Sequence, residues 1–285
     1  MATQVVLITG CSSGIGLEAC LAFARRGDTT VASMRDLSKA DALMKRAADE
    51  GLPIELVQLD VTDQASIAAA VATVEQRHGG IDVVVNNAGV GYDGALETID
   101  LDRARAVLEA NLWGPVQVTR AVLPAMRARR SGVVINVTSV AGRVPGTPFA
   151  GFYAASKHGM NALSEALCQE VEPFGIRVVC VEPGFFQTQI NANAEDDSQE
   201  LGPYAAQYNW VRTFFDKSVE TGGGDPAVVA TAIVAAANDA DTPLHVLVGD
   251  DAVMFVDLVT SLGTYEAWRP VSVDIVSGVA GPRPT

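Results

Sequence analysis

Short runs of apolar, often β-branched residues recur along the chain and alternate with stretches of helical periodicity. The runs are apolar almost throughout, which is the pattern of strands buried on both faces of a sheet. Regular alternation of such strands with helices predicts a parallel sheet covered by helices on both faces, a three-layer α/β/α architecture. The expected strands span residues 5–9, 30–33, 54–59, 83–86, 133–137, 176–181 and 244–248.

The helical stretches and the remaining segments fit one domain over residues 1–285, without an internal repeat or a linker. Residues 185–225 lose the regular pattern and combine an acidic patch, an aromatic run and glycines, which predicts a lid over an active site. Residues 250–285 form a C-terminal extension, and its Pro- and Gly-containing tail from Arg269 is expected to be partly mobile. Helices are expected at residues 16–26, 36–50, 64–78, 102–129, 153–174 and 226–237, with a further apolar segment at 253–262.

Charge and composition exclude several classes of function. The formal net charge is −14, whereas nucleic-acid binding needs a basic stripe and adhesion to anionic membranes needs basic clusters. The longest apolar stretch, residues 227–237, is too short to span a bilayer, and the N-terminus has no leader pattern. The four cysteines show no Cys-x-x-Cys spacing and the histidines no metal-ligand spacing, so we expect reduced thiols, no metal and a cytoplasmic protein.

A glycine-rich turn follows the first expected strand and leads directly into a helix. Its sequence is Thr9-Gly10-Cys11-Ser12-Ser13-Gly14-Ile15-Gly16. Glycines permit a tight turn and a close backbone approach to a pyrophosphate, which then lies at the positive end of the helix. In this strand–turn–helix context the motif favours nucleotide binding over a merely structural turn.

Tyr153 and Lys157 are four residues apart in an expected helix, which places their side chains on one helix face. A phenol with a pKa of about 10 is a poor acid or base at neutral pH. An ammonium group held nearby favours the phenolate and lowers the tyrosine pKa toward the range of efficient acid–base catalysis. Alone, the pair is weak evidence, because this spacing more often reflects a solvated lysine over a half-buried ring.

Further motifs join these two and together carry a family resemblance over roughly residues 1–190. The chain resembles the main group of short-chain dehydrogenases/reductases, with the motifs in the family's order and spacing. The resemblance implies a Rossmann-like, doubly wound parallel sheet and an NAD(P)-dependent oxidoreductase. The three-residue gap between the first two glycines separates this group from the extended sugar epimerase branch. The matching residues are Thr9-Gly10-x-x-x-Gly14-Ile15-Gly16, Asp60-Val61, Asn86-Asn87-Ala88-Gly89, Asn111, Ser139, Tyr153-x-x-x-Lys157 and Pro183-Gly184.

The resemblance implies four catalytic residues. Tyr153 would exchange a proton with the substrate oxygen, and Lys157 would lower the tyrosine pKa and hold the nicotinamide ribose. Ser139 would hydrogen-bond the substrate oxygen, although neighbouring Thr138 is a competing hydroxyl. Asn111 would anchor a water on the lysine; its other interpretation is a solvent-facing helix residue. The implied cofactor contacts are Gly10, Ser12, Ser13, Gly14, Ile15, Gly16, Arg35, Asp60, Val61, Asn87, Ala88, Gly89, Tyr153, Lys157, Pro183, Gly184, Phe186 and Thr188.

The end of the second strand indicates which cofactor is used. NAD specificity in this fold normally requires an acidic residue there, which binds the ribose hydroxyls. That position reads as Met34, followed by Arg35, so no acid repels a 2′-phosphate and a guanidinium can bind it. We therefore expect NADP in preference to NAD. A register two residues further along would make Asp36 the ribose-binding acid.

The substrate is expected to be a fairly hydrophobic alcohol or ketone. The glycine turn and the segment 33–37 are similar to the hydroxysteroid and retinol dehydrogenase branch. The lid residues Tyr204, Tyr208, Val211 and Phe215 form one helical stripe, although such stripes more often pack as core. Additional pocket walls are expected from Phe149, Phe152, Phe185 and Phe186.

Three other functions are alternatives to this oxidoreductase. A cofactor-sensing protein without turnover is disfavoured because the chain retains both Tyr153 and Lys157. A dehydratase or epimerase is disfavoured by the glycine spacing, and an NAD-preferring polar-alcohol dehydrogenase stays open.

Family members commonly pair through the helices expected at 102–129 and 153–174, which favours a homodimer. A tetramer is also possible, although the residues beyond Val248 would obstruct packing of the last strand.

Overall fold

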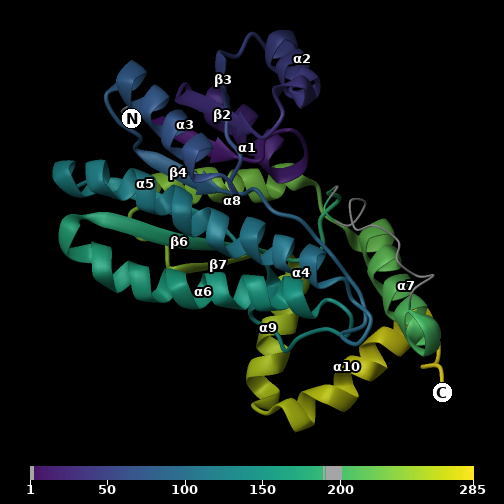
Figure 1. The fold of residues 1–285 in the computed structure, drawn as a ribbon. Helices are drawn as coiled ribbons and strands as arrows, with labels where there is room; N and C mark the ends of the chain where they lie inside the picture. Colours follow the sequence, from purple (N-terminus) through teal and green to yellow (C-terminus); the bar gives the residue numbers. More distant parts are fainter. Residues whose placement is uncertain (1–2, 189, 191–200) are drawn as a thin grey trace.

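The computed structural model describes residues 3–188, 190 and 201–285 of the chain. Their core is a seven-stranded sheet with the order β3-β2-β1-β4-β5-β6-β7, in which all neighbouring strands are parallel. This is the predicted Rossmann-like α/β fold, wound in both directions from β1 (Figure 1). The strands are β1 (Val5–Thr9), β2 (Thr29–Met34), β3 (Ile54–Gln58), β4 (Val83–Asn86), β5 (Gly132–Val137), β6 (Ile176–Pro183) and β7 (His245–Val248).

Two helical layers cover the sheet. Apolar residues of α1 (Gly14–Arg26), α2 (Asp41–Glu50) and α8 (Pro226–Asn238) pack into one hydrophobic cluster with one face of the strands. Those of α3 (Gln64–His78), α5 (Gly114–Arg129) and α6 (Gly151–Val171) pack into a second cluster on the other face. The near-continuous apolar runs therefore reflect burial of the strands on both sides. No helix among residues 3–188, 190 and 201–285 is long and apolar enough to cross a membrane.

The helix expected over residues 102–129 is interrupted. It consists of α4 (Leu101–Leu108), a π-helical turn (Glu109–Trp113) and α5. A π-turn inserts backbone into a helix and displaces one side chain from the regular face, and such turns are frequent at functional sites. Asn111 lies in this turn and is buried. The helix expected from residue 36 begins at Asp41 because the Asp36 carboxylate caps a short 3₁₀ turn by accepting from the Ser38 backbone N–H.

The C-terminal segment is more regular than expected. Of the tail from Arg269, which the Pro and Gly content marked as partly mobile, residues 269–280 lie in α10 (Tyr265–Ala280), a helix that contains Pro270. α10 packs against α7 (Ala205–Gly222) through Trp210, Val211, Phe214 and Val276. α9 (Asp250–Leu262) connects β7 to this pair of helices, which stands beyond one end of the sheet (Figure 1).

Buried polar side chains join α5 and α6 to the middle of the sheet. The Asn86 amide on β4 donates to Asn136 Oδ1 on β5 at 2.8 Å and to Thr119 Oγ1 on α5 at 3.0 Å. Asn136 Nδ2 in turn donates to Ser164 Oγ on α6 at 2.9 Å. Because these bonds are directional and lie inside apolar clusters, they set the rotation of both helices against the strands.

We expect Asn136→Ala to lower the free energy of unfolding by roughly 2–4 kcal/mol, because it removes two buried hydrogen bonds, to Asn86 and to Ser164, and opens a small cavity. Urea unfolding measures the effect. Asn238→Ala is the matched control, since Asn238 Nδ2 bonds only the Val234 carbonyl of its own surface helix, and we expect a loss below about 0.5 kcal/mol. Equal losses for the two variants would contradict this account.

Candidate active site

One cavity of about 480 Å³ lies at the carboxyl ends of the strands and extends to α7 and α10. Nearly all of the site residues predicted from the sequence line it, including Ser139, Tyr153 and Lys157. The two predicted residues outside the lining are Gly16 and Asn111. The structure thus brings together residues that are up to 178 positions apart, from Gly10 to Thr188. Parallel strands explain this convergence, because all of their carboxyl ends meet at one edge.

The glycine turn is shaped as a cradle. Gly10 and Gly14 have positive φ angles of 74° and 56°, and a Cβ on Gly10 would lie 2.7 Å from the Ala88 Cα. A Cβ on Gly16 would lie 2.4 Å from both Asn87 Nδ2 and the Gly10 carbonyl oxygen. Gly16 therefore allows close packing of α1 instead of facing the cavity. Ser13 at the N-cap makes no side-chain cap bond, so the positive end of α1 faces the cavity with backbone N–H groups that suit a phosphate.

Thr9 and Asn87 hold this cradle against the next strand. The Thr9 hydroxyl accepts from the backbone N–H groups of Asn87 and Ala88 at 3.0 Å each. Asn87 Nδ2 donates to the carbonyls of Thr9 at 2.9 Å and Gly10 at 3.1 Å. The side chain of Asn87 therefore joins the turn to the segment after β4, and its neighbours Ala88 and Gly89 supply cavity wall.

The end of β2 corrects the predicted position of the cofactor-selecting residue. Met34 is only 3% exposed and packs in the hydrophobic core, away from the cavity. Arg35 is exposed and lines the cavity together with Asp60 and Val61. Asp36 accepts hydrogen bonds from the Ser38 backbone N–H at 3.0 Å and the Ser38 hydroxyl at 2.7 Å, and it does not line the cavity. Strand alternation points Met34 inward, and Arg35 is the residue that faces a ligand.

Tyr153, Lys157 and Ser139 meet at the centre of the cavity. Lys157 Nζ lies 5.6 Å from the centroid of the Tyr153 ring and donates to the Val137 carbonyl at 3.0 Å. The Ser139 side chain lowers the pKa of Tyr153 through hydrogen bonding, donates to the Pro183 carbonyl at 3.5 Å and accepts from the Ala141 backbone N–H at 3.1 Å. Thr138, the competing hydroxyl, donates instead to the Val181 carbonyl at 3.5 Å. The structure therefore pairs the tyrosine with Ser139.

Burial dominates the protonation of this group. It raises the pKa of Tyr153 to about 12, with the Ser139 hydrogen bond opposing and the Asp93 charge adding to the rise. Burial also lowers the pKa of Lys157 to about 8. In the protein alone the tyrosine pKa therefore moves upward, opposite to the lowering that we expected from Lys157. At neutral pH the site holds a proton on the Tyr153 phenol and a cationic Lys157, as a proton donor requires.

Asn111 connects the cofactor side of the cavity to α6. Its Nδ2 donates to the Val90 carbonyl at 2.9 Å and to Ser156 Oγ at 3.3 Å, and its Oδ1 accepts from the Val90 backbone N–H at 2.8 Å. The residue is buried, so the solvent-facing interpretation was wrong. Its contacts fix the segment after Asn87 against the helix of Tyr153. The predicted water between Asn111 and Lys157 stays a prediction.

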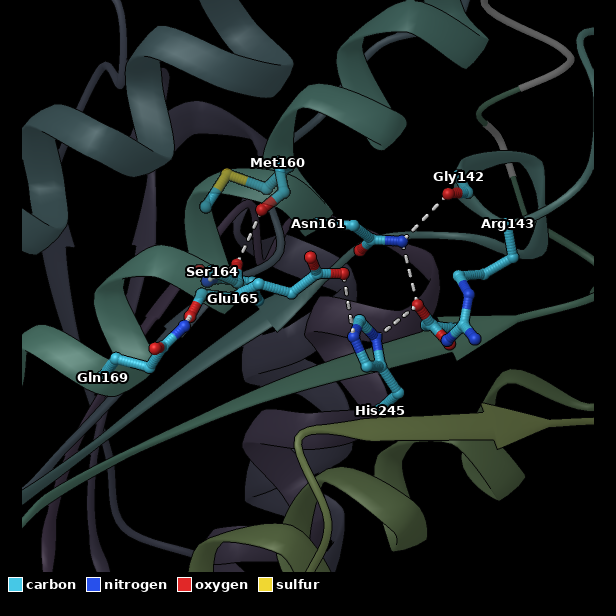
Figure 2. Close-up of polar contacts among 10 residues, drawn as sticks. Gly142, Arg143, Met160, Asn161, Ser164, Glu165, Gln169 and His245 are labelled. Atoms are coloured by element: carbon cyan, nitrogen blue, oxygen red, sulfur yellow. Dashed lines mark hydrogen bonds and ion pairs between the residues drawn. The ribbon is translucent and has the colours of Figure 1, made fainter. Parts of the chain in front are cut away.

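A buried ionic network that the sequence did not indicate lies behind the catalytic face (Figure 2). Glu182 on β6 is fully buried and contacts Arg143 Nη1 at 3.0 Å, Asn161 Nδ2 at 2.9 Å and His245 Nδ1 at 3.0 Å. His245 Nε2 also lies 3.2 Å from Glu165 Oε1. The network joins the turn after Ser139, the α6 turn after Lys157 and the strand before Pro183. It is invisible in the sequence because a lone Glu in an apolar strand has no motif.

The far end of the cavity is mostly apolar, and the structure changes its predicted composition. Of the predicted helical stripe, Val211 and Phe215 line this end, whereas Tyr204 and Tyr208 do not. The predicted wall residues Phe185 and Phe186 also line it. Phe149 packs edge-on against Tyr208 and Phe152 is absent from the lining. The helical spacing of apolar residues in α7 and α10 is the sequence signal that could have identified the remaining apolar lining residues. Lining residues not predicted include Asp93, Val144, Trp210, Arg212, Phe214, Asp216, Val219, Phe255, Trp268, Ser272, Val273, Ile275 and Val276.

The predicted lid is described only in part. α7 covers residues 205–222 of it, and residues 189 and 191–200 lie outside the described part of the chain. Within the described part, α7 and α10 together close the apolar end of the cavity.

Asp93 is a carboxyl at this apolar end. Burial raises its pKa from the ordinary value of 3.8 to about 6, and the charge of Arg212 partly opposes this rise. Arg212 itself is bound by Asp216, with 3.1 Å between Nε and Oδ1, and lies 3.5 Å from the Tyr208 hydroxyl. The negative charge of an ionised Asp93 is therefore poorly solvated, and the positive charge of Arg212 compensates it only in part.

Comparisons with known proteins agree with this geometry. The family model for short chain dehydrogenases matches residues 4–199. Oxidoreductase BOA17 of Botryotinia fuckeliana is 33% identical over 273 residues, covering 95% of this chain and 98% of the relative. Retinol dehydrogenase 8 of Bos taurus is 41% identical over 193 residues, covering 66% and 61%. A metagenomic short-chain oxidoreductase solved with NADP is 30% identical, with a TM-score of 0.68, covering 86% of this chain and 96% of that one.

We expect Asp93→Asn to stabilise the protein more at pH 8 than at pH 5. The folded-state pKa of about 6 exceeds the ordinary 3.8, so the folded protein binds this proton more tightly than the unfolded chain. Stability from this group is therefore present below about pH 4 and is lost as the pH rises through 6. The gain from the neutral amide should be about 1 kcal/mol larger at pH 8.

Urea unfolding at the two pH values measures this difference. Glu97→Gln serves as control because it removes an exposed carboxylate of the same segment. A stability gain in Asp93→Asn that is the same at pH 5 and pH 8 would contradict the assignment of a buried, ionised carboxylate.

Proposed function

The chain belongs to the short-chain dehydrogenase family, and from that membership we propose an NADP(H)-dependent oxidoreductase that interconverts an alcohol and a ketone or aldehyde on a fairly hydrophobic substrate. One observation carries this proposal. A protonated Tyr153, hydrogen-bonded to Ser139 and beside Lys157, lies between a glycine cradle and an apolar cavity end. This arrangement supports acid–base catalysis on an oxygen of an apolar molecule, next to a bound nucleotide.

The proposed roles of the chain's own residues follow from their contacts. A bound nicotinamide dinucleotide supplies or accepts the hydride. Tyr153 donates the proton of its hydroxyl to the substrate oxygen in reduction and accepts one in oxidation. The Ser139 hydroxyl orients that oxygen and the phenol. The Lys157 ammonium stabilises negative charge on the phenol oxygen during transfer, and its bond to the Val137 carbonyl keeps it in place.

The residues at the other end suit NADP. The backbone N–H groups at the start of α1 and the turn from Gly10 to Ile15 would hold the pyrophosphate. Arg35 would bind a 2′-phosphate, and Asp60 and Val61 would border the adenine. The proposed cofactor contacts are completed by four further residues that line the same cavity, Pro183, Gly184, Phe186 and Thr188. The relative solved with NADP supports this choice of cofactor.

The apolar end supports the hydrophobic substrate, and the name of the similar retinol dehydrogenase 8 agrees with it. We further propose a homodimer through α5 and α6. Trp113, in the π-turn directly before α5, and Leu163 on α6 are exposed at 50% and 43% and provide apolar contact area. A cytoplasmic location remains part of the proposal.

We expect Tyr153→Phe to lower kcat for reduction roughly 100- to 10,000-fold, because the phenyl ring has no proton to donate. NADPH oxidation measured with a steroid, a retinoid and a short polar ketone tests chemistry and substrate class together. Tyr204→Phe is the control, since Tyr204 lies outside the cavity lining and bonds Glu97. Full activity in Tyr153→Phe would contradict the proposed chemistry, and turnover of the polar ketone alone would remove the hydrophobic substrate.

We expect Arg35→Ser to raise the KM for NADPH roughly 10- to 100-fold and to leave the KM for NADH nearly unchanged, because only NADPH carries the phosphate that the guanidinium binds. Steady-state kinetics with both cofactors measure the change. Arg105→Ser, at an exposed arginine paired with Asp102, is the control. An unchanged KM for NADPH in Arg35→Ser would place the selecting residue elsewhere.

A further inference from the structure

The substrate end of the cavity contains charge that hydride transfer does not require. Among the described lining residues at this end, the ionisable side chains beyond Tyr153 are Asp93, Arg212 and Asp216. The other residues that line this end, which include Phe214, Phe255 and Val276, are mostly apolar. Charged groups are costly in such a place unless they are paired. Their presence therefore indicates a specific polar requirement of the ligand.

Arg212 is already engaged by other groups. Its Nε binds Asp216 Oδ1 at 3.1 Å, and its Nη1 lies 3.5 Å from the Tyr208 hydroxyl. Asp93 differs from it, because no hydrogen bond or ion pair holds its carboxylate to another residue of the described chain. Arg212 acts on Asp93 only as a nearby charge. Asp93 is thus the acceptor that is available to a ligand.

Asp93 shares the cavity with the reacting group. Its charge acts on the Tyr153 phenol, and both residues line the same cavity. Asp93 follows the segment Asn87–Val90, which Thr9 and Asn111 hold by hydrogen bonds on either side. A substrate oxygen at Tyr153 would therefore put neighbouring atoms of the same substrate within reach of Asp93.

We propose that Asp93 binds a hydrogen-bond donor, a hydroxyl or an amino group, that the substrate carries within a few bonds of its reacting carbonyl. The inference rests on the proposed function and narrows its substrate class to apolar ketones with such a neighbouring donor. The long apolar part of the substrate lies along α7 and α10, and the donor satisfies the carboxylate that the protein leaves without a partner. Hydrogen bonds to charged groups are among the stronger ones, so this contact discriminates between substrates.

The test compares matched ketones with and without the donor. The probes are 2-dodecanone, 1-hydroxy-2-dodecanone and 1-amino-2-dodecanone, with 2-oxododecanoate as the anionic counterpart. We expect kcat/KM for the hydroxy or amino ketone to exceed that for 2-dodecanone roughly 10- to 100-fold. Asp93→Leu, which keeps similar volume without an acceptor, should lose this ratio. Asp93→Asn should keep part of the preference for a hydroxyl but lose that for an ammonium, which distinguishes the two donors.

Glu97→Gln removes a carboxylate of the same segment outside the cavity lining, and it should retain the wild-type ratio. A wild-type ratio near one, a ratio that survives in Asp93→Leu, or a preference for 2-oxododecanoate would overturn the proposal. The last outcome would assign ligand binding to Arg212 instead.

A binding measurement separates this inference from the proposed function. Calorimetry on the complex with NADP⁺ compares 2-dodecanol, 1,2-dodecanediol and 1-amino-2-dodecanol without any turnover. Tighter binding of the diol or amino alcohol that Asp93→Leu abolishes supports the donor site even if no ketone is reduced. Absence of reduction for every ketone would reject the proposed activity alone, and equal binding of the three alcohols would reject the donor site.

Discussion

The polar contacts between α6 and the sheet are the interaction on which the site depends. Four polar side chains on the inner face of this helix, Ser156, Lys157, Asn161 and Ser164, are buried. Each has a partner outside the helix: Ser156 on the π-turn, Lys157 and Ser164 on β5, and Asn161 on β6 and on the turn after Ser139. Apolar packing alone would let a helix slide or rotate at small cost, whereas a set of directional buried bonds does not. Tyr153 belongs to the first turn of the same helix, so its position follows from bonds made further along it.

The burial that orders the site also disfavours the charged forms of its ionisable side chains. Removal from water raises the pKa of Tyr153 and of Asp93 and lowers that of Lys157, so each group is biased toward its neutral form. For the tyrosine this bias is useful, because a proton donor must hold its proton at neutral pH. For Lys157 the Val137 carbonyl offers partial compensation. Asp93 has no comparable partner among the described residues, so its negative charge opposes folding, and the proposed donor of the substrate would compensate that charge.

The features of the fold and site that could be predicted from the sequence are those in which the backbone itself constrains residue choice. Strands buried on both faces must be apolar, and the turn at Gly10 and Gly14 needs positive φ angles, so both features were visible without coordinates. Sequence reasoning failed where position depends on tertiary neighbours. The position of the selecting residue at the end of β2 was read as Met34, which is buried, whereas Arg35, already expected to bind a 2′-phosphate, lines the cavity; period-two alternation does not reveal which face is the core. Glu182 and the π-turn at Asn111 leave no local pattern. Pro270 and nearby glycines suggested a loose tail, yet apolar packing against α7 made that segment helical.

The cavity therefore has two ends of different physical origin. The nucleotide end is built from backbone: glycine conformations, a helix terminus and the edges of parallel strands, which together admit few alternatives. The substrate end is built from side chains of α7 and α10, whose packing sets the shape but not the backbone geometry of the fold. Asp93 is connected to both ends, because it follows the segment that Asn87 fixes to the glycine turn and lines the same cavity as Tyr153. A donor on the substrate that binds there is positioned relative to both the nucleotide site and the proton donor, so a single carboxylate can contribute to selection and to alignment of the reacting carbon.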